Sequence, residues 1–262
     1  MKTSENRNAA GFFGLMLILS LPFYALGATG AALPFASALP LSALMAVVPM
    51  IAALVLVTQQ SGLLGAARLF KRAFDFRGIP SLWWVLAAIA IMPICFALTA
   101  GIVSLMAATR PALHTFPATA IIPAFALFFL GAVTEEIGWQ GYAYPALTHR
   151  SSALTAALII GVVWALWHVI PFALMGRSAV WIFWQGVGMV CMRIIIVWLV
   201  VNAGQSIAVA VLFHMMSNSV WGIFANFDTY YDPRIMCIVL LAAVIVVMVL
   251  WATTTLTLFR KV

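Results

Sequence analysis

The stretch ATAIIPAFALFFLGAVTEEIGWQGY, residues 118–142, decides the fold, because an uncharged apolar run ends in two adjacent carboxylates, Glu135 and Glu136. A charged side chain at the centre of a bilayer costs at least about 2.5–3.5 kcal/mol, so charges found there usually mark functional sites. Successive helix residues point about 100° apart, and the two carboxylates therefore face different directions. Glu135 shares a face with Trp139, whereas Glu136 shares one with Gln140. We expect different roles for the two.

Composition places the chain in a membrane. Of its 262 residues, 66% are hydrophobic and 7% are charged, against about 45–50% and about 25% in soluble domains. The net charge of +7 would suggest a nucleic-acid partner in a soluble protein. Here the positive-inside rule explains it better, and no nucleic acid is expected as a partner. The three cysteines, Cys95, Cys191 and Cys237, lie in apolar runs without metal-type spacing and are predicted to be buried small hydrophobes.

Hydropathy predicts an all-α, polytopic integral membrane protein with about eight transmembrane helices in one domain, residues 1–262. A spanning helix needs about 20 apolar residues. The basic start before the first span also resembles a signal peptide. Residues 59–80 carry bases among apolar side chains and form either an amphipathic helix on the membrane surface or an ordinary positive loop. The predicted spans are 11–28, 41–57, 82–106, 118–144, 153–174, 180–201, 206–224 and 235–258.

Eight spans put both chain ends on the same side of the membrane. Basic residues then divide unequally between the two sides, with Arg193 set aside as intramembrane, and the richer side is predicted to be cytoplasmic. We expect a bacterial cytoplasmic membrane with both termini in the cytoplasm. The richer side holds Lys2, Arg7, Arg68, Lys71, Arg72, Arg77, Arg150, Arg260 and Lys261, and the other holds Arg110, Arg177 and Arg234.

Two later spans carry polar residues that lipid-facing helices avoid. His168 ends the run Trp164-Ala165-Leu166-Trp167-His168, and His214 and Asn218 share a face at i,i+4 spacing. A carboxylate and a neutral imidazole can together take a proton from water. A second imidazole and an amide can stabilise an oxyanion. Together with Glu135, these groups suit hydrolysis of an amide bond, with Trp164 as a supporting residue.

Metal chemistry is the alternative. No His-Glu-x-x-His run is present, yet Glu135, His168 and His214 could hold zinc from separate helices. We expect that no cofactor is required, with zinc as the open possibility.

Three stretches resemble the CPBP family of membrane proteins, which comprises CAAX proteases and bacteriocin-processing or abortive-infection proteins. The resemblance covers about 118–221 and implies an intramembrane endopeptidase core with an eight-helix fold. It also implies that Glu135 and His168 activate water, that His214 and Asn218 form the oxyanion hole, and that Glu136 supports the site. The substrate would be a membrane-embedded or lipid-anchored protein, including CAAX-type C-termini. The stretches are Glu135-Glu136-Ile137-Gly138-Trp139-Gln140-Gly141-Tyr142, Trp164-Ala165-Leu166-Trp167-His168 and His214-Met215-Met216-Ser217-Asn218.

One position departs from the family pattern. Gln140 stands where the family usually has arginine, so Glu136 lacks its i+4 cationic partner. Arg193 is the candidate replacement, because a lipid-facing arginine at mid-membrane is expensive. The alternatives are a protonated Glu136 and an Arg193 that extends along its stem to the membrane surface.

Two further functions compete with the protease. A catalytically weak scaffold or bacteriocin-immunity factor would retain the same fold, and the loss of arginine at position 140 favours it slightly. A proton-coupled transporter would also use intramembrane Glu and His. Transporters of this size often show internal repeats, and the sequence shows none.

Overall fold

The computed structural model describes residues 8–33, 36–106, 118–224, 230–251 and 256. Five bases that entered the topology count, Lys2, Arg7, Arg110, Arg260 and Lys261, lie outside these residues. The helices are α1 (Ala9–Ala28), α2 (Val48–Arg72), α3 (Leu82–Met106), α4 (Ala118–Gly138), α5 (Tyr144–Thr148), α6 (Ala153–Leu174), α7 (Ala179–Asn202), α8 (Ile207–Ser219) and α9 (Pro233–Leu250). Shorter elements are strands β1 (Ala32–Leu33) and β2 (Ala36–Pro40), the 3₁₀ helix Leu41–Val47, and the π-helical turns Trp139–Ala143 and Val220–Phe224.

The helices confirm an all-α polytopic membrane protein. Seven helical segments of the described chain are long and apolar enough to cross a bilayer. The eighth predicted span, 206–224, is present as the shorter apolar helix Ile207–Ile223. About eight spans were predicted, and the difference arises because α8 is short.

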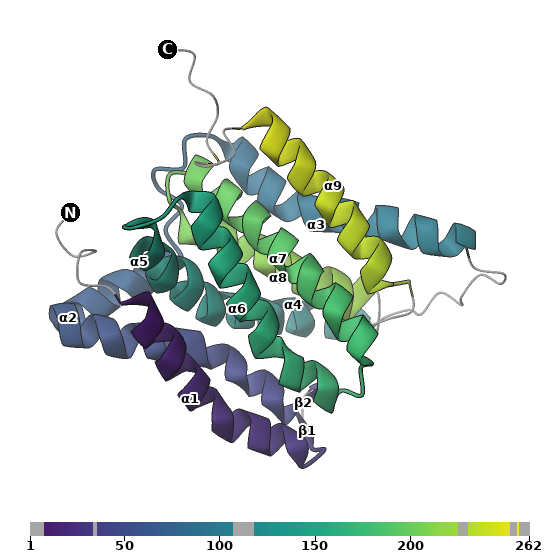
Figure 1. The fold of residues 1–262 in the computed structure, drawn as a ribbon, viewed down its shortest axis with the longest axis horizontal. Coiled ribbons are helices and arrows are strands. Elements are labelled where there is room, and N and C mark those ends of the chain that lie inside the picture. Colours follow the sequence, from purple (N-terminus) through teal and green to yellow (C-terminus); the bar gives the residue numbers. More distant parts are fainter. Residues whose placement is uncertain (1–7, 34–35, 107–117, 225–229, 252–255, 257–262) are drawn as a thin grey trace.

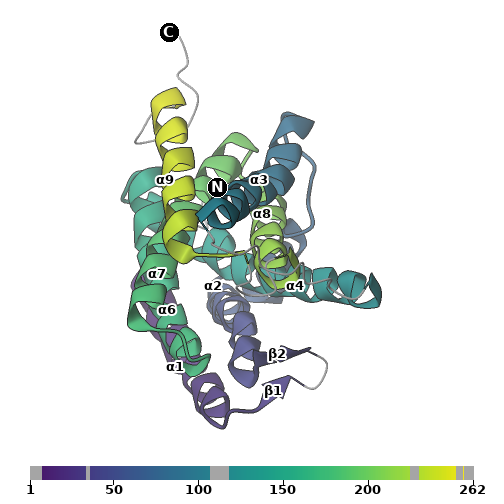
Figure 2. The same cartoon turned by 90° about the vertical axis from the view of Figure 1, so that its right-hand side faces the viewer.

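The core of the bundle is built by α7 and α8 (Figures 1 and 2). Helix α7 packs against α6 and α9, while α8 packs against α3, α4 and α7. Residues 191–200 of α7 are all buried, as are most residues of α8. A polar residue at one of these buried positions is therefore surrounded by protein rather than by lipid.

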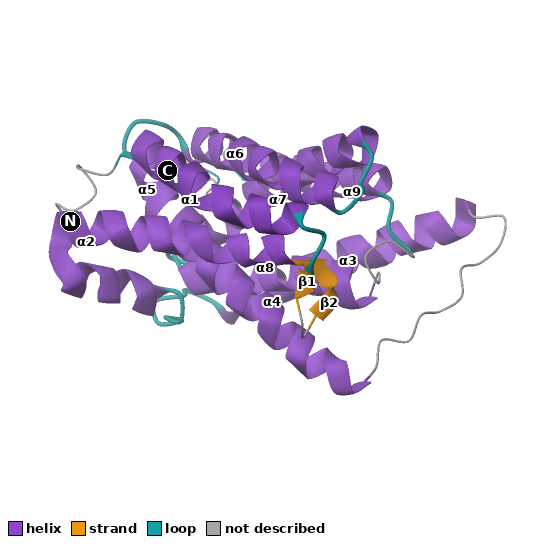
Figure 3. Ribbon diagram, turned by 90° about the horizontal axis from the view of Figure 1, so that it is seen from below, coloured by secondary structure: helices purple, strands orange, loops and turns teal. Residues whose placement is uncertain are grey.

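Residues 29–80 differ most from the sequence prediction. A short antiparallel hairpin, β1 and β2, was not predicted. The second predicted span and the basic segment after it share one element, α2, which is broken at Gly62 by a backbone with φ +66° and ψ −178°. Figure 3 shows the resulting bend of α2. Residues 63–72 are helical, so the prediction of an ordinary loop was wrong for them.

The predicted helix 118–144 is interrupted by a π-helical turn, Trp139–Ala143. Close packing against α2 explains its glycines. A Cβ on Gly138 would lie 2.6 Å from the Pro49 carbonyl oxygen, and one on Gly141 would lie 2.7 Å from Leu69 Cδ1. Single π turns inside α-helices occur frequently at functional sites.

The base count predicts membrane orientation. We expect a reporter fused after Val262 to be active only when it is a type that functions in the cytoplasm, because the richer set of bases lies on that side. Paired cytoplasmic and periplasmic reporters at this position provide the measurement. Activity of the periplasmic reporter alone would overturn the assignment.

Candidate active site

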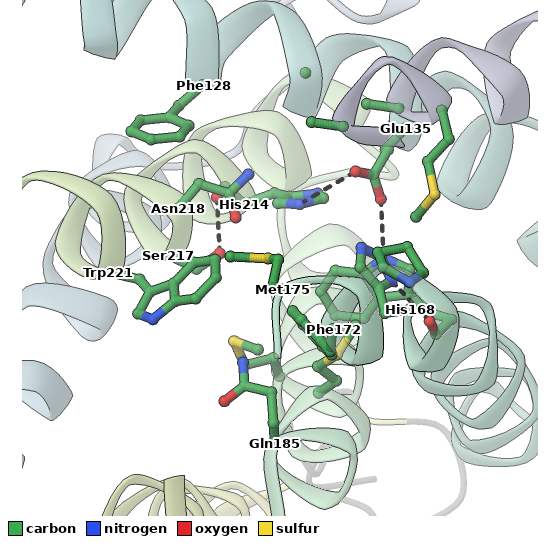
Figure 4. A pocket seen from close by; sticks show the side chains of 18 of the residues that line it. Phe128, Glu135, His168, Phe172, Met175, Gln185, His214, Ser217, Asn218 and Trp221 are labelled. Carbon is green, nitrogen blue, oxygen red and sulfur yellow. Dashed lines mark hydrogen bonds and ion pairs between the residues drawn. The ribbon is translucent and has the colours of Figure 1, made fainter. Parts of the chain in front are cut away.

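Four helices bring the predicted polar residues together inside the bundle, and Figure 4 shows Glu135, His168, His214 and Asn218 among them. Helix α4 supplies the two glutamates, α6 supplies His168, and α8 supplies His214 and Asn218. The fourth helix, α7, supplies Arg193. Glu135, Glu136, Arg193 and His214 are each at most 6% exposed, so their charges must be balanced within the protein.

Two indoles hold one oxygen of Glu135. Its Oε2 accepts hydrogen bonds from Trp164 Nε1 at 2.8 Å and from Trp139 Nε1 at 3.3 Å. Its Oε1 lies 4.0 Å from His214 Nε2, across the gap drawn as a dashed line in Figure 4. The carboxylate is thus fixed in orientation by α4 and α6 and presents its second oxygen toward α8.

Glu136 joins a different network, as the helix geometry predicted. Arg193 Nη1 donates to both of its oxygens, at 3.0 Å and 2.8 Å. His214 Nδ1 lies 2.8 Å from Glu136 Oε1. A carboxylate paired with arginine is an acceptor only, so Nδ1 must carry the proton. Glu136 therefore fixes both the ring orientation and the tautomer of His214, and leaves Nε2 directed toward Glu135.

Arg193 occupies a closely packed interior position. Its guanidinium carbon lies 4.5 Å from the ring centre of Trp164 and 5.9 Å from that of Trp139. Gly161 allows α6 to approach, because a Cβ there would lie 3.2 Å from the Cβ of Arg193. The prediction that Arg193 faces the interior and pairs with Glu136 is confirmed, and the snorkelling alternative is wrong.

His168 is held by its own helix. Its Nδ1 lies 2.9 Å from the Trp164 carbonyl oxygen, which can only accept, so Nδ1 is the donor and Nε2 of the neutral ring keeps its lone pair. The ring makes edge contacts with Trp164 and Trp167, with centroid distances of 5.6 Å and 4.9 Å. A half-buried imidazole with a free lone pair is suited to accept a proton.

These groups form one wall of an apolar cavity of about 300 Å³. Glu135, His168, His214, Ser217 and Asn218 all line it, and Figure 4 shows them around a common space. The Ser217 hydroxyl donates to the His214 carbonyl oxygen at 2.8 Å, so its proton is used in a hydrogen bond to the backbone of its own helix. The remaining lining is largely apolar and includes Met92, Phe128, Phe172, Met189 and Trp221.

Gln140 is placed differently from its expected supporting role. It is 2% exposed, and neither atom of its amide makes a hydrogen bond within the described part of the chain. Glu136, four residues earlier, bonds to Arg193 and His214 instead. The cationic partner of Glu136 thus comes from α7 rather than from the next turn of α4.

Sequence reasoning did not identify two polar contacts near the cavity. Tyr231 donates from its hydroxyl to Gln185 Oε1, and both side chains line the cavity. Gln60 Nε2 donates to the Tyr142 hydroxyl at 2.9 Å, which joins α2 to the π-helical turn. Neither pair has regular sequence spacing, so the sequence contained no signal for it.

The zinc alternative has little support in the donor geometry. Among the described residues, no group of three or more His, Cys, Asp or Glu side chains is placed to hold a metal ion. One oxygen of Glu135 is held by two indoles, and both oxygens of Glu136 are held by Arg193. Of the four carboxylate oxygens, these contacts leave Glu135 Oε1 as the one that none of them holds.

Comparison with known proteins identifies relatives of the site-bearing segment. Residues 116–220 match the family model described as type II CAAX prenyl endopeptidase Rce1-like. Over 109 residues the chain is 35% identical to a protein of Methanococcus maripaludis named CAAX prenyl protease 2. The aligned part is 38% of this chain and 40% of that protein, so the chain spans less than half the length of this curated relative.

Proposed function

We propose that this chain, whose residues 116–220 match the Rce1-like model of type II CAAX prenyl endopeptidases, is an intramembrane endopeptidase. One observation carries the proposal: Glu135, His168, His214 and Asn218 come from three helices and line one apolar cavity inside the bundle. A general base and oxyanion donors in a water-poor, preorganised site are what amide hydrolysis needs.

The reaction uses each group in a definite role. Glu135, assisted by His168, removes a proton from a water molecule, whose oxygen bonds to the scissile carbonyl carbon. The carbonyl becomes an oxyanion that accepts hydrogen bonds from His214 Nε2 and the Asn218 amide. The stored proton then passes to the leaving nitrogen as the C–N bond breaks, which gives a carboxylic acid and an amine.

Glu136 and Arg193 serve this mechanism through His214. The Nδ1 proton of His214 is committed to Glu136, so only a doubly protonated ring can donate from Nε2 to the oxyanion. Glu136, itself held by Arg193, fixes the position of the His214 ring, so that Nε2 is the ring atom that faces Glu135 and the cavity.

The substrate class follows from the lining and the relatives. A cavity whose walls are mostly apolar accepts hydrophobic side chains or a lipid group beside the scissile bond. The substrate is a membrane-embedded or lipid-anchored protein, and CAAX-type C-termini are the first to test because the Methanococcus relative is named for them.

The test uses the purified full chain in proteoliposomes. Peptides that end in Cys-aliphatic-aliphatic-X, with and without a prenyl group on cysteine, are incubated with it, and mass spectrometry identifies any released C-terminal tripeptide. Cleavage on the C-terminal side of the cysteine supports the proposal. Folded protein that cleaves neither peptide, nor membrane peptides captured from cells by Glu135→Gln, would favour the non-catalytic scaffold.

Asn218→Ala should lower kcat about 10²- to 10³-fold with little change in KM, because it removes an oxyanion donor that acts mainly in the transition state. Ser219→Ala is the matched control, since Ser219 lies next in the chain and donates only to the backbone of its own helix. Equal losses in both variants would argue that the effect is structural.

Hydrolysis should survive incubation with a chelator. The motivation is the commitment of carboxylate oxygens to Trp139, Trp164 and Arg193, which leaves Glu135 and His168 to activate water without a metal. Turnover before and after chelator treatment, with metal content determined by elemental analysis, is the measurement. Loss of turnover with loss of stoichiometric zinc, and recovery on its return, would overturn this mechanism.

A further inference from the structure

Residues 63–77, named here the surface segment, begin directly after the break at Gly62 and carry four of the chain's bases. The helical part, residues 63–72, continues α2 in a new direction (Figure 3). The part of α2 before Gly62 follows the 3₁₀ helix and is long and apolar enough, with it, to cross a bilayer. The surface segment thus starts where a spanning helix ends.

One face of the surface segment is bound to the protein. Gly65, Leu69 and Ala73 are buried and recur every four residues, so they lie on one side of the helix. Leu69 contacts Gly141 of the π-helical turn, where an added Cβ would lie 2.7 Å from Leu69 Cδ1. The segment is therefore docked and cannot rotate about its axis.

A second face is apolar and uncovered. Leu63, Phe70 and Phe74 are 78%, 42% and 45% exposed. Leu63 and Phe70 lie seven residues apart on one side of the helix, beside the buried face, and the Phe74 ring just beyond the helix packs on Phe70 with ring centroids 5.5 Å apart. In a water-soluble protein such a strip would mark an interface, but in this membrane protein it can lie in the acyl region.

The third face is basic. Arg68, Lys71 and Arg72 are all exposed and share the sector beyond the apolar strip with the exposed side chain of Leu64. None of the three forms an ion pair with another residue in the described ranges. Arg77, by contrast, is paired with Asp75 at 2.8 Å, and this pairing lowers the pKa of Asp75 to about 2. Arg68 and Lys71 therefore face outward together, and the exposed Arg72 beside them also reaches the Gln205 carbonyl oxygen at 3.5 Å.

We propose that the surface segment is a binding site for the headgroups of anionic phospholipids. Arginine and lysine beside an apolar strip place their charges at headgroup depth while the strip enters the acyl boundary. A nucleic acid or acidic protein would match the positive charge of the segment but would leave the apolar strip in water. The site fits phosphate groups on a bilayer because both faces are then satisfied together.

Helix α2 touches the turn that follows the two glutamates on both sides of its break. Leu69 of the surface segment packs on Gly141, and Gln60, before the break, donates to the Tyr142 hydroxyl. Residues 141 and 142 continue directly from Trp139, whose indole binds Glu135. Lipid bound at the surface segment would hold α2 against this turn and so restrict the motion of the Glu135 side chain. This second step rests on the proposed function, whereas headgroup binding does not.

Headgroup binding is tested with the full chain in liposomes that contain spin-labelled phosphatidylglycerol or spin-labelled phosphatidylcholine. Electron spin resonance reports the fraction of each lipid held at the protein, and hence their relative association constant. We expect wild type to prefer phosphatidylglycerol. In the variant R68Q/K71Q/R72Q the relative association constant for phosphatidylglycerol should fall at least about fivefold, which is the contribution expected of about one basic residue. The double variant R68Q/K71Q keeps the Arg72 contact with the Gln205 carbonyl and should show a smaller loss.

Arg150→Gln is the matched control, because Arg150 is also an exposed base but lies outside the surface segment. Unchanged preference in both folded multiple variants, or an equal loss in Arg150→Gln, overturns the proposed site.

Turnover is then compared in phosphatidylcholine with and without phosphatidylglycerol. Stimulation in wild type that R68Q/K71Q abolishes supports the link to Glu135, and its absence overturns that link alone. Absence of turnover in every lipid counts against the proposed function, while the spin-label result still decides the lipid site.

Discussion

Glu135→Gln should lower kcat by about 10²- to 10⁴-fold, the usual contribution of a general base. The amide is nearly the same size as the carboxylate, and its oxygen can still accept from Trp164 Nε1 and Trp139 Nε1. What is lost is the ability of the oxygen facing His214 to take a proton. We therefore expect the folded structure and the substrate affinity to remain while chemistry stops.

The measurement is single-turnover cleavage by the purified variant, with a thermal unfolding midpoint taken in the same detergent. Met92→Leu is the control, because Met92 lines the same cavity and the exchange conserves volume without a polar group. Turnover by Glu135→Gln close to that of Met92→Leu would remove Glu135 from the mechanism. His168 or a metal would then have to activate water.

The long helices could be predicted well from sequence. The predicted spans 82–106 and 153–174 coincide with α3 and α6, and 180–201 differs from α7 by one residue at each end. Such accuracy reflects one strong physical constraint, since a bilayer requires about 20 apolar residues and satisfied backbone groups. Serine N-caps at 152 and 178 then fix where α6 and α7 start.

The irregular elements could not be predicted in this way. The π-helical turn after Gly138 arises where α2 approaches so closely that Gly138 and Gly141 have no room for a Cβ. The break at Gly62 requires a positive φ that glycine permits, but a glycine among apolar residues does not by itself predict a bend in the helix. Both features depend on which helices become neighbours, and hydropathy has no information about that.

The residues of the site were predictable because polar groups are rare in these spans. The separation of the two glutamates followed from helix geometry, and the structure places Glu135 with Trp139 and Glu136 with Arg193. The convergence of His214 on both carboxylates required the fold. The catalytic roles of these residues stay predictions until the variants are measured.

Arg193→Leu should lower the free energy of unfolding by about 3–5 kcal/mol, the usual consequence of removing one partner of a buried ion pair. Arg193 and Glu136 are both 0% exposed, and Arg193 supplies two hydrogen bonds to the carboxylate. Without it, Glu136 keeps only His214 as a partner. Chemical unfolding in mixed micelles measures the loss, and Ile194→Leu, a volume-conserving change at the next residue of α7, is the control.

A double variant separates the ion pair from simple packing. Glu136→Gln removes the buried charge that Arg193→Leu leaves unpaired, so the double variant should be destabilised by less than the sum of the two single variants, with a coupling of about 0.5–3 kcal/mol.

Gln140→Arg provides a second test of the ion pair. The Gln140 amide is buried and has no hydrogen-bond partner among the described residues, and an arginine there would stand four residues after Glu136, in the π-helical turn that continues α4. It should restore much of the stability lost in Arg193→Leu and little in the Glu136→Gln background. If the two losses simply add and Gln140→Arg restores nothing, Arg193 stabilises the bundle through its contacts with Trp139 and Trp164 rather than by neutralising Glu136.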